Sequence, residues 1–325
     1  MDGVYGNYYE FSGEGTAENP YLINNLYELK YFRDDVNGGN NYAGKYIQLN
    51  ADIDLAGENW VGIGTATTDH GFMGNFDGKT YKIKNLTITN PALDSDNYAY
   101  AGLFGVTEGT ETAQNTIKNL TIENVTISTT GHIVSAAIAY PYYTIVDNVK
   151  VCGNINITGG DYTAGALAYT RRCVDASNIT VEGGENSIIK GEKTVGGVIS
   201  DIQMNGGLTA NYSNFSASNV TVEGDMSVGG ISGIIAGQTL NTCSVMNVTL
   251  VCSDNRVGIV SGSLGAPSTI TNVTVDNVTG ATNIIGATYD GGKAVEAKIG
   301  DLLTRVDVLE KINHDFASAD AALKS

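Results

Sequence analysis

Tyrosine and arginine side chains recur at matching positions in two consecutive segments of this chain. Aligning the segments on their small residues, Ala136 and Gly165, places Tyr140 opposite Tyr169. Aromatic faces beside guanidinium groups favour cation–π contacts, and exposed tyrosines next to charges are used to bind sugar rings or partner proteins. We therefore expect a binding patch, the alternative being a tyrosine ladder that covers a loop. The candidate residues are Tyr140, Tyr142, Tyr143, Tyr169, Arg171 and Arg172.

Residues for catalysis or metal binding are much less evident. The three histidines share no metal-ligand spacing, and no HExxH, CxxC or P-loop motif occurs. A polysaccharide-active enzyme needs carboxylates and a basic residue in one groove, and the spacing of the nearest candidates is unconvincing. The sequence thus predicts no catalytic residue, no metal and no cofactor. Those nearest candidates are Asp161, Arg171, Lys193 and Asp201.

A repeated four-residue phrase predicts the elements that would hold the patch together. Most copies read Asn-apolar-Thr-apolar, as in NLTI and NVTV. Apolar residues at every second position are typical of a strand with one buried face. Each repeat of about 30 residues has room for two or three short strands, too few for a propeller blade, so a parallel β-helix is predicted. The phrases begin at Asn85, Asn119, Asn148, Asn178, Asn219, Asn247 and Asn272.

A second strand is predicted around the small residues that follow each phrase, from AGLFG at 101–105 to NIIGA at 283–287. The segment between phrase and small residue shortens from 85–102 in an early repeat to 219–229 in a late one. We therefore expect early coils with a third strand, such as NVTI at 124–127, and a narrower cross-section later. Asparagine tolerates left-handed backbone and stacks in hydrogen-bonded ladders, so each opening asparagine is expected at a corner.

These residues also carry a resemblance to a known family. GLFG at 102–105 is an instance of the GLUG motif, Gly-Leu-hydrophobic-Gly, and GALA, GGVI, GGIS and GIVS are looser copies. The N-terminal stretches GEGTAENPYLINNLYELKYF and FMGNFDGKTYKIKNLTI are similar to GLUG-repeat proteins of bacterial surfaces. The resemblance runs from about Gly13 to about Ala287. It implies a right-handed parallel β-helix, secreted or surface-attached and often proposed as an adhesin, and it implies no catalytic residue set.

The two ends of the chain are expected to be helical caps. Residues 24–39 have the capping residue Asn25, Glu28 in capping-box spacing and a glycine pair at the end. Residues 301–316 have helical apolar spacing and are expected to cap the other end or to dock onto a partner. The predicted divisions are an N-terminal segment with its helix cap at 1–44, the β-helix at 45–290 and a C-terminal helical cap at 291–325.

Composition narrows the range of partners. Lys and Arg number 18 against 35 Asp and Glu, for a net charge of −17. Nucleic acids and anionic membranes require basic patches, so neither is expected as a partner. No apolar run is long enough to span a membrane. We expect a monomer with four free, largely buried cysteines, located outside the cell or on an outer-membrane surface. Residues 1–6 do not resemble a signal peptide, so any signal or lipid anchor is expected to be missing from this sequence.

Three functions fit these observations. The favoured one is a non-enzymatic surface or adhesion module that binds a host or bacterial glycan or protein. The second is a polysaccharide lyase or glycoside hydrolase, an analogy at the level of the fold. The third is a structural stalk or spacer. Binding to a carbohydrate or protein surface would separate the first from the third, and release of sugars would establish the second.

Overall fold

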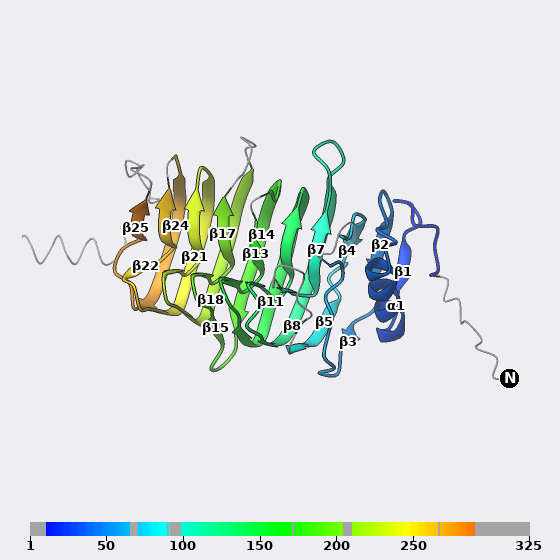
Figure 1. Cartoon of the computed structure of the whole chain (residues 1–325), viewed down its shortest axis with the longest axis horizontal. Coiled ribbons are helices and arrows are strands. Elements are labelled where there is room, and N and C mark those ends of the chain that lie inside the picture. Colours follow the sequence, from blue (N-terminus) through cyan, green and yellow to red (C-terminus); the bar gives the residue numbers. More distant parts are fainter. Residues whose placement is uncertain are drawn as a thin grey trace, which may run out of the picture.

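The chain winds into a right-handed parallel β-helix, which confirms the predicted fold class (Figure 1). The computed structural model describes residues 11–65, 71–89, 91, 99–170, 172–203, 210–265 and 267–289. Its strands form three parallel sheets of 12, 7 and 6 strands, called here sheets A, B and C. A typical coil passes once through each sheet, so residues about 30 positions apart in sequence become neighbours in space.

Sheet A is the largest sheet and contains the strands that carry the repeated phrase. Its strands are β1 (Tyr21–Ile23), β2 (Tyr46–Leu49), β3 (Ile53–Asp54), β4 (Asn75–Asp77), β5 (Lys82–Thr89), β8 (Asn115–Ser128), β11 (Thr144–Thr158), β14 (Asp175–Gly183), β15 (Ile188–Lys190), β18 (Asn211–Gly224), β21 (Thr239–Cys252) and β24 (Thr269–Thr279).

Sheets C and B follow in each coil and are joined by a tight turn. Sheet C contains β6 (Tyr100–Ala101), β9 (Ile133–Val134), β12 (Tyr162–Ala164), β16 (Thr194–Gly196), β19 (Ser227–Gly229) and β22 (Arg256–Gly258). Sheet B contains β7 (Phe104–Glu108), β10 (Ile138–Tyr142), β13 (Leu167–Tyr169), β17 (Ile199–Gln203), β20 (Ser232–Ala236), β23 (Ser261–Gly265) and β25 (Ile285–Tyr289). At this turn a Cβ on Gly196 would lie 1.8 Å from the Ile199 carbonyl oxygen, so only glycine fits.

The apolar positions of the repeated phrase fill the interior of the solenoid. In the phrase at Asn219, Val220 and Val222 are 4% and 0% exposed, whereas Thr221 between them is half-buried and faces outward. The other phrases behave alike, except that Val275 in the last described phrase is half-buried. The period-two pattern therefore predicts the buried face correctly.

Asparagines turn the chain at the corners, as predicted, because they accept left-handed backbone. All seven phrase asparagines have φ between 52° and 58°. Their side chains link neighbouring coils. For example, Asn148 Nδ2 donates to Asn119 Oδ1 at 2.8 Å, and Asn247 Nδ2 donates to Asn219 Oδ1 at 3.0 Å.

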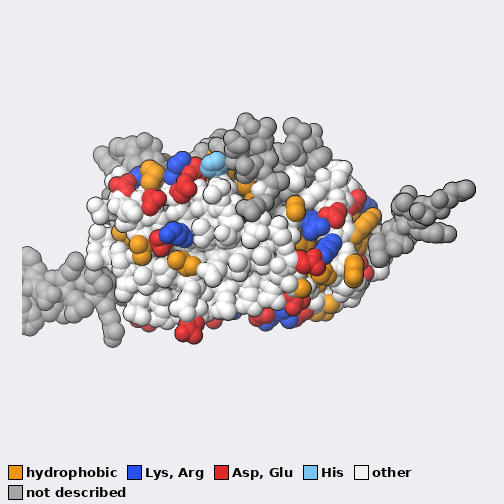
Figure 2. Space-filling model, turned by 60° about the horizontal axis from the view of Figure 1, so that its bottom comes forward, with side chains coloured by type: hydrophobic (Ala, Val, Ile, Leu, Met, Phe, Trp, Pro, Cys, Tyr) orange, Lys and Arg blue, Asp and Glu red, His pale blue; other side chains and the backbone are white. Residues whose placement is uncertain are grey.

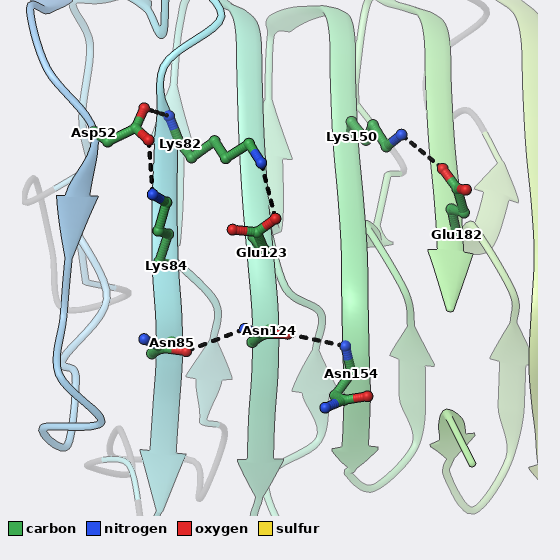
Figure 3. Close-up of polar contacts among 9 residues, drawn as sticks. All are labelled: Asp52, Lys82, Lys84, Asn85, Glu123, Asn124, Lys150, Asn154 and Glu182. Atoms are coloured by element: carbon green, nitrogen blue, oxygen red, sulfur yellow. Dashed lines mark hydrogen bonds and ion pairs between the residues drawn. The ribbon is translucent and has the colours of Figure 1, made fainter. Parts of the chain in front are cut away.

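The asparagines form two columns, which corrects the predicted single series. The first corner holds Asn119, Asn148 and Asn178, followed by Asn214. A second corner comes five or more residues after the first corner in the same coil, and it holds Asn85, Asn219 and Asn247. Figure 3 shows its early members, where Asn124 Nδ2 donates to Asn85 Oδ1 at 3.2 Å and Asn124 Oδ1 accepts from the Asn154 backbone N–H at 3.0 Å.

The expectation of a narrower late cross-section is therefore wrong. Strand β18 contains both corners, at Asn214 and Asn219, as β8 does at Asn119 and Asn124. The first corner of β18 reads NFSA, with serine in place of threonine, so the phrase search selected the second corner instead. The distance from phrase to small residue seemed to shorten because the late phrases lie at the second corner. The late coils pass through the same corners as the early ones.

The predicted N-terminal helix is confirmed as α1 (Leu26–Asn37), which lies at the N-terminal end of the row of coils (Figure 1). Asn25 Oδ1 accepts from the Glu28 backbone N–H at 3.1 Å. The Glu28 carboxylate reaches one residue further back than a standard capping box and accepts from the Asn24 backbone N–H at 2.6 Å. The helix buries an apolar face that includes Phe32.

The predicted domain limits stay predictions. Strand β1 pairs in parallel with β2, so sheet A already includes residues 21–23 of the predicted N-terminal segment. The predicted C-terminal helix at 301–316 lies outside the described residues. Within the part of the chain that is described, no helix has the length and apolar character needed to cross a membrane.

Candidate functional site

The pairing of β10 with β13 positions the tyrosines. Ile138 pairs with Leu167, which puts Tyr140 beside Tyr169 on the next coil. One residue after β10, Tyr143 adopts a left-handed backbone with φ 48°, and an isolated bridge joins Tyr142 to Arg172. Five of the six predicted patch residues thus lie together, and the sixth, Arg171, lies outside the described residues.

The tyrosine rings touch one another in edge-to-face pairs. Tyr140 contacts Tyr142 and Tyr169, with ring centroids 5.7 Å and 5.4 Å apart. Tyr142 and Tyr143 are closer, at 4.9 Å and nearly perpendicular. Each of these side chains is half-buried, so the rings pack on each other and keep part of their surface in contact with solvent.

Arg172 joins the phenol groups. Its Nη1 atom donates to the hydroxyl oxygens of Tyr142 at 3.0 Å and Tyr143 at 3.2 Å. The guanidinium carbon also lies 5.3 Å from the Tyr142 ring centroid and 5.7 Å from that of Tyr143, which is cation–π geometry. We call Tyr140, Tyr142, Tyr143, Tyr169 and Arg172 the tyrosine–arginine patch.

Two tyrosines that the sequence reasoning missed extend the patch onto sheet C. Tyr100 stacks on Tyr140 with centroids 5.9 Å apart, and Tyr162 meets Tyr169 edge-to-face at 4.9 Å. Both belong to one column, because each pairs with Ile133 of β9. Extending the alignment backwards from the small residues of each coil would have found them, since each tyrosine comes two or three residues before its glycine.

A small apolar cluster separate from the main core supports these rings. It consists of Ile133, Ala139 and Ala168, with Tyr100, Tyr162 and Tyr169 packed against it. Ala139 and Ala168 belong to sheet B and Ile133 to sheet C, so the cluster joins the two sheets. One side of these rings therefore covers apolar residues, and both the binding patch and the tyrosine ladder over a loop stay predictions.

The surroundings of Tyr140 and Arg172 shift the pKa of each group. Burial raises the pKa of Tyr140 well above its ordinary value of 10.0, and the neighbouring tyrosines raise it further. The pKa of Arg172 is also raised, first by the charge interaction with Tyr142 and then by the hydrogen bond to Tyr143. At neutral pH Tyr140 is therefore an uncharged phenol and Arg172 carries a positive charge.

The residues considered for an enzyme do not form a catalytic pair with the patch. Asp161 Oδ2 accepts from Lys193 Nζ at 2.7 Å, so this acid is in an ion pair. Asp201 is buried on β17, in register with Tyr169. Among the described residues, no group of three His, Cys, Asp or Glu side chains could hold a metal ion.

The four cysteines are free, as predicted. Cys173 and Cys243 are buried, and Cys152 and Cys252 are half-buried. Burial raises the pKa of Cys243 to about 12 and raises that of Cys173 as well. These thiols remain protonated at neutral pH and are poor nucleophiles.

Elsewhere on the solenoid, lysines and acids on adjacent coils neutralise one another. Figure 3 shows Lys82 Nζ at 2.8 Å from Glu123 and Lys150 Nζ at 2.6 Å from Glu182. On the face seen in Figure 2, blue and red side chains lie next to each other, with wide uncharged areas between them. The patch differs from this surface because its cation lies against phenols.

Comparisons with known proteins connect the chain to large proteins over part of its length. No family model matches it. Halomucin from Haloquadratum walsbyi is 30% identical over 165 residues, which are 48% of this chain and 2% of halomucin. A protein named "Putative Gly-rich membrane protein" from Evansella cellulosilytica is 33% identical over 147 residues, 43% of this chain and 15% of that protein. The chain therefore spans only a small share of these curated relatives.

One solved structure superposes on most of the solenoid. It is a crystal structure described as a "putative immunoglobulin A1 protease" from Bacteroides ovatus, with a TM-score of 0.49 and 18% sequence identity. The superposition covers 91% of this chain and 89% of that one.

Proposed function

We propose that this chain is a non-enzymatic surface or extracellular module that binds glycans through the tyrosine–arginine patch. The observation that carries the proposal is the patch itself, in which half-buried rings from consecutive coils pack together and two of them contact a single cation. Aromatic rings offer flat apolar surfaces, and phenol and guanidinium groups beside them offer hydrogen bonds, which together suit a sugar ring.

The wider setting supports a surface role. The names of halomucin and of the Gly-rich membrane protein fit a protein of the cell surface. We also propose that the chain is of the GLUG-repeat type, because GLFG at 102–105 stands at the turn from sheet C to sheet B and its looser copies stand at the same turn in later coils. An outer-membrane attachment and a monomeric state belong to the same proposal.

A non-enzymatic role is favoured over catalysis by the chemistry of the described groups. Histidine and carboxylates are the commonest general acids and bases, and the five residues of the patch include neither. The paired carboxylates of a glycosidase are not found in it. A stalk or spacer would need no partly exposed aromatic cluster beside an arginine.

The test is retention on a glycan array followed by affinity measurement on the glycans that are retained. Replacing Tyr142 and Arg172 together with alanine should weaken binding at least about tenfold, because a ring face and a charged donor are lost. The matched control replaces Tyr27, which is 74% exposed on α1, and Lys190, an exposed cation of sheet A, and should bind as the parent does.

Other results would favour other functions. Unchanged binding by the double variant would reject the patch as the site. Retention of a protein partner but of no glycan would favour protein adhesion, and retention of nothing would favour a spacer. Release of unsaturated or reducing sugar ends from a retained polysaccharide would show an enzyme.

A further inference from the structure

Arg172 is unusual among the cations of this acidic protein. Most described lysines and arginines lie within ion-pair distance of a carboxylate, as Lys190 does with Glu223 at 2.6 Å. Arg172 has no such carboxylate within the described ranges, and its contacts are the hydroxyls and rings of Tyr142 and Tyr143. Lys45, over the Tyr21 ring at 5.8 Å, is the other described cation of this kind. The charge on Arg172 is thus not neutralised by a carboxylate of the described residues.

The hydrogen bonds within the patch leave donor groups unused. Both N–H groups of Nη1 are directed to phenol oxygens, so each phenol accepts from the arginine and keeps its own O–H to donate. A guanidinium has five N–H groups, so those of Nη2 and Nε remain. Neither these nor the two phenol O–H groups have an acceptor among the residues that the structure describes. The outer edge of the patch therefore offers donors and a positive charge together.

We propose that the tyrosine–arginine patch selects acidic glycans, those that carry a carboxylate or a sulfate group. The anionic oxygens accept from Arg172 and from the hydroxyls of Tyr142 and Tyr143, while the sugar ring lies against the tyrosine faces. A planar guanidinium binds such anions through two parallel hydrogen bonds. This inference rests on the proposed glycan-binding function and names its ligand class.

The overall negative charge of −17 opposes an anionic ligand but does not prevent local binding. Charges farther away than about 8 Å are largely screened at physiological salt, whereas a contact with Arg172 is not. Glu108 lies in register with Tyr142 on the preceding coil. Binding should consequently be local, salt-sensitive and dependent on this one arginine.

The experiment compares polymers that differ only in their anionic group. Polygalacturonate is measured against its fully methyl-esterified form for the carboxylate, and dextran sulfate against dextran for the sulfate. We expect the full chain to bind at least one acidic polymer about tenfold or more tightly than its neutral counterpart at 50 mM NaCl. The pair that shows the preference identifies the anion.

Three variants tie that preference to Arg172. Arg172→Gln keeps an amide donor without the charge and should reduce the preference to about twofold or less. Arg172→Lys keeps the charge without the two-pronged donor and should retain part of it. Lys190→Gln removes the same charge from an exposed ion pair elsewhere and should bind as the parent does. Near-ultraviolet circular dichroism and melting temperature report whether Arg172→Gln keeps the tyrosines packed.

The two proposals fail in different ways. Equal binding of acidic and neutral polymers, or an Arg172→Gln variant with the parent's preference, overturns the selectivity and leaves glycan binding in place. Absence of binding to all four polymers and to the glycan array overturns the glycan-binding function itself, and the inference with it.

Discussion

The alternation of buried and outward residues is the feature on which each strand depends. Val222 is 0% exposed and Thr221 beside it faces outward, on a strand that pairs with Ile188–Lys190 on one side and with β21 on the other. Burying such a valine contributes about 1.5–3 kcal/mol. Shifting the strand by one residue would expose the valines and bury the threonine, so the register is strongly specified.

Replacing Val222 with aspartate should therefore be severe. The unpaired charge enters a dry layer between coils and apolar burial is lost, so we expect a cost of about 4 kcal/mol or more. Thr221→Ser should cost less than about 1 kcal/mol, because its side chain points away from the core. Urea denaturation of both variants measures the difference. Equal shifts would show that the strand register is wrong by one residue.

At the scale of the element, the corners decide how the strands follow one another. A left-handed residue costs most L-amino acids about 1–2 kcal/mol, and asparagine lowers that cost while its side chain bonds to the next coil. Asn148 combines the two roles, with φ 53° and a 2.8 Å hydrogen bond to Asn119. Each corner is thus stabilised both within its coil and between coils.

We expect Asn148→Ala to cost about 1–3 kcal/mol, since backbone strain and the lost hydrogen bond add. Asn148→Gly should cost less, because glycine accepts positive φ and only the hydrogen bond is missing. The control is Asn156→Ala on the same strand, where asparagine is exposed without a positive φ. Thermal denaturation of the three variants ranks them. An alanine variant no worse than the glycine variant would mean that the corner conformation is not under strain.

The ion pairs between coils contribute less than the corners to the stability of these strands. Lys150 and Glu182 are about half exposed, at 44% and 48% of their side-chain surface. Exposed pairs of this kind contribute little to stability because solvent screens them. They place opposite charges side by side on adjacent strands, where like charges would be destabilising.

At the scale of the whole molecule, the solenoid is a row of coils that each contact only their neighbours. The N-terminal end is closed by α1, whose Phe32 is 0% exposed and packs 5.3 Å from Phe72 and 5.2 Å from Tyr42, measured between ring centroids. Loss of structure at this end should therefore spread along the solenoid only through the contacts between neighbouring coils.

Phe32→Ala should remove about 3–5 kcal/mol from the N-terminal end, as large-to-small changes in a core do. Hydrogen exchange should then accelerate in β1, β2 and β4, while β21 and β24 keep their protection. Tyr27→Ala, on the exposed side of α1, is the control and should leave both ends unchanged. Loss of protection along the entire row would show that the solenoid unfolds as one cooperative unit.

The sequence alone determined the features that depend on nearby residues. The buried face of each strand, the left-handed asparagines, the capped helix at 26–37 and the pairing of Tyr140 with Tyr169 all follow from patterns within one coil or between two coils of equal length. Short-range steric preferences and a period of two are enough to specify them.

Only the tertiary structure decided which corner each asparagine occupies and that the rings of Tyr100 and Tyr162 contact those of the predicted patch. The assignment of Asn219 to the second corner, and the arrival of Tyr100 and Tyr162 beside the predicted tyrosines, depend on how coils of unequal length stack. The phrase is written almost identically at both corners, so its letters cannot distinguish them. The register between coils does distinguish the two corners, because it is set by the hydrogen bonds of strands that are about 30 residues apart in the chain.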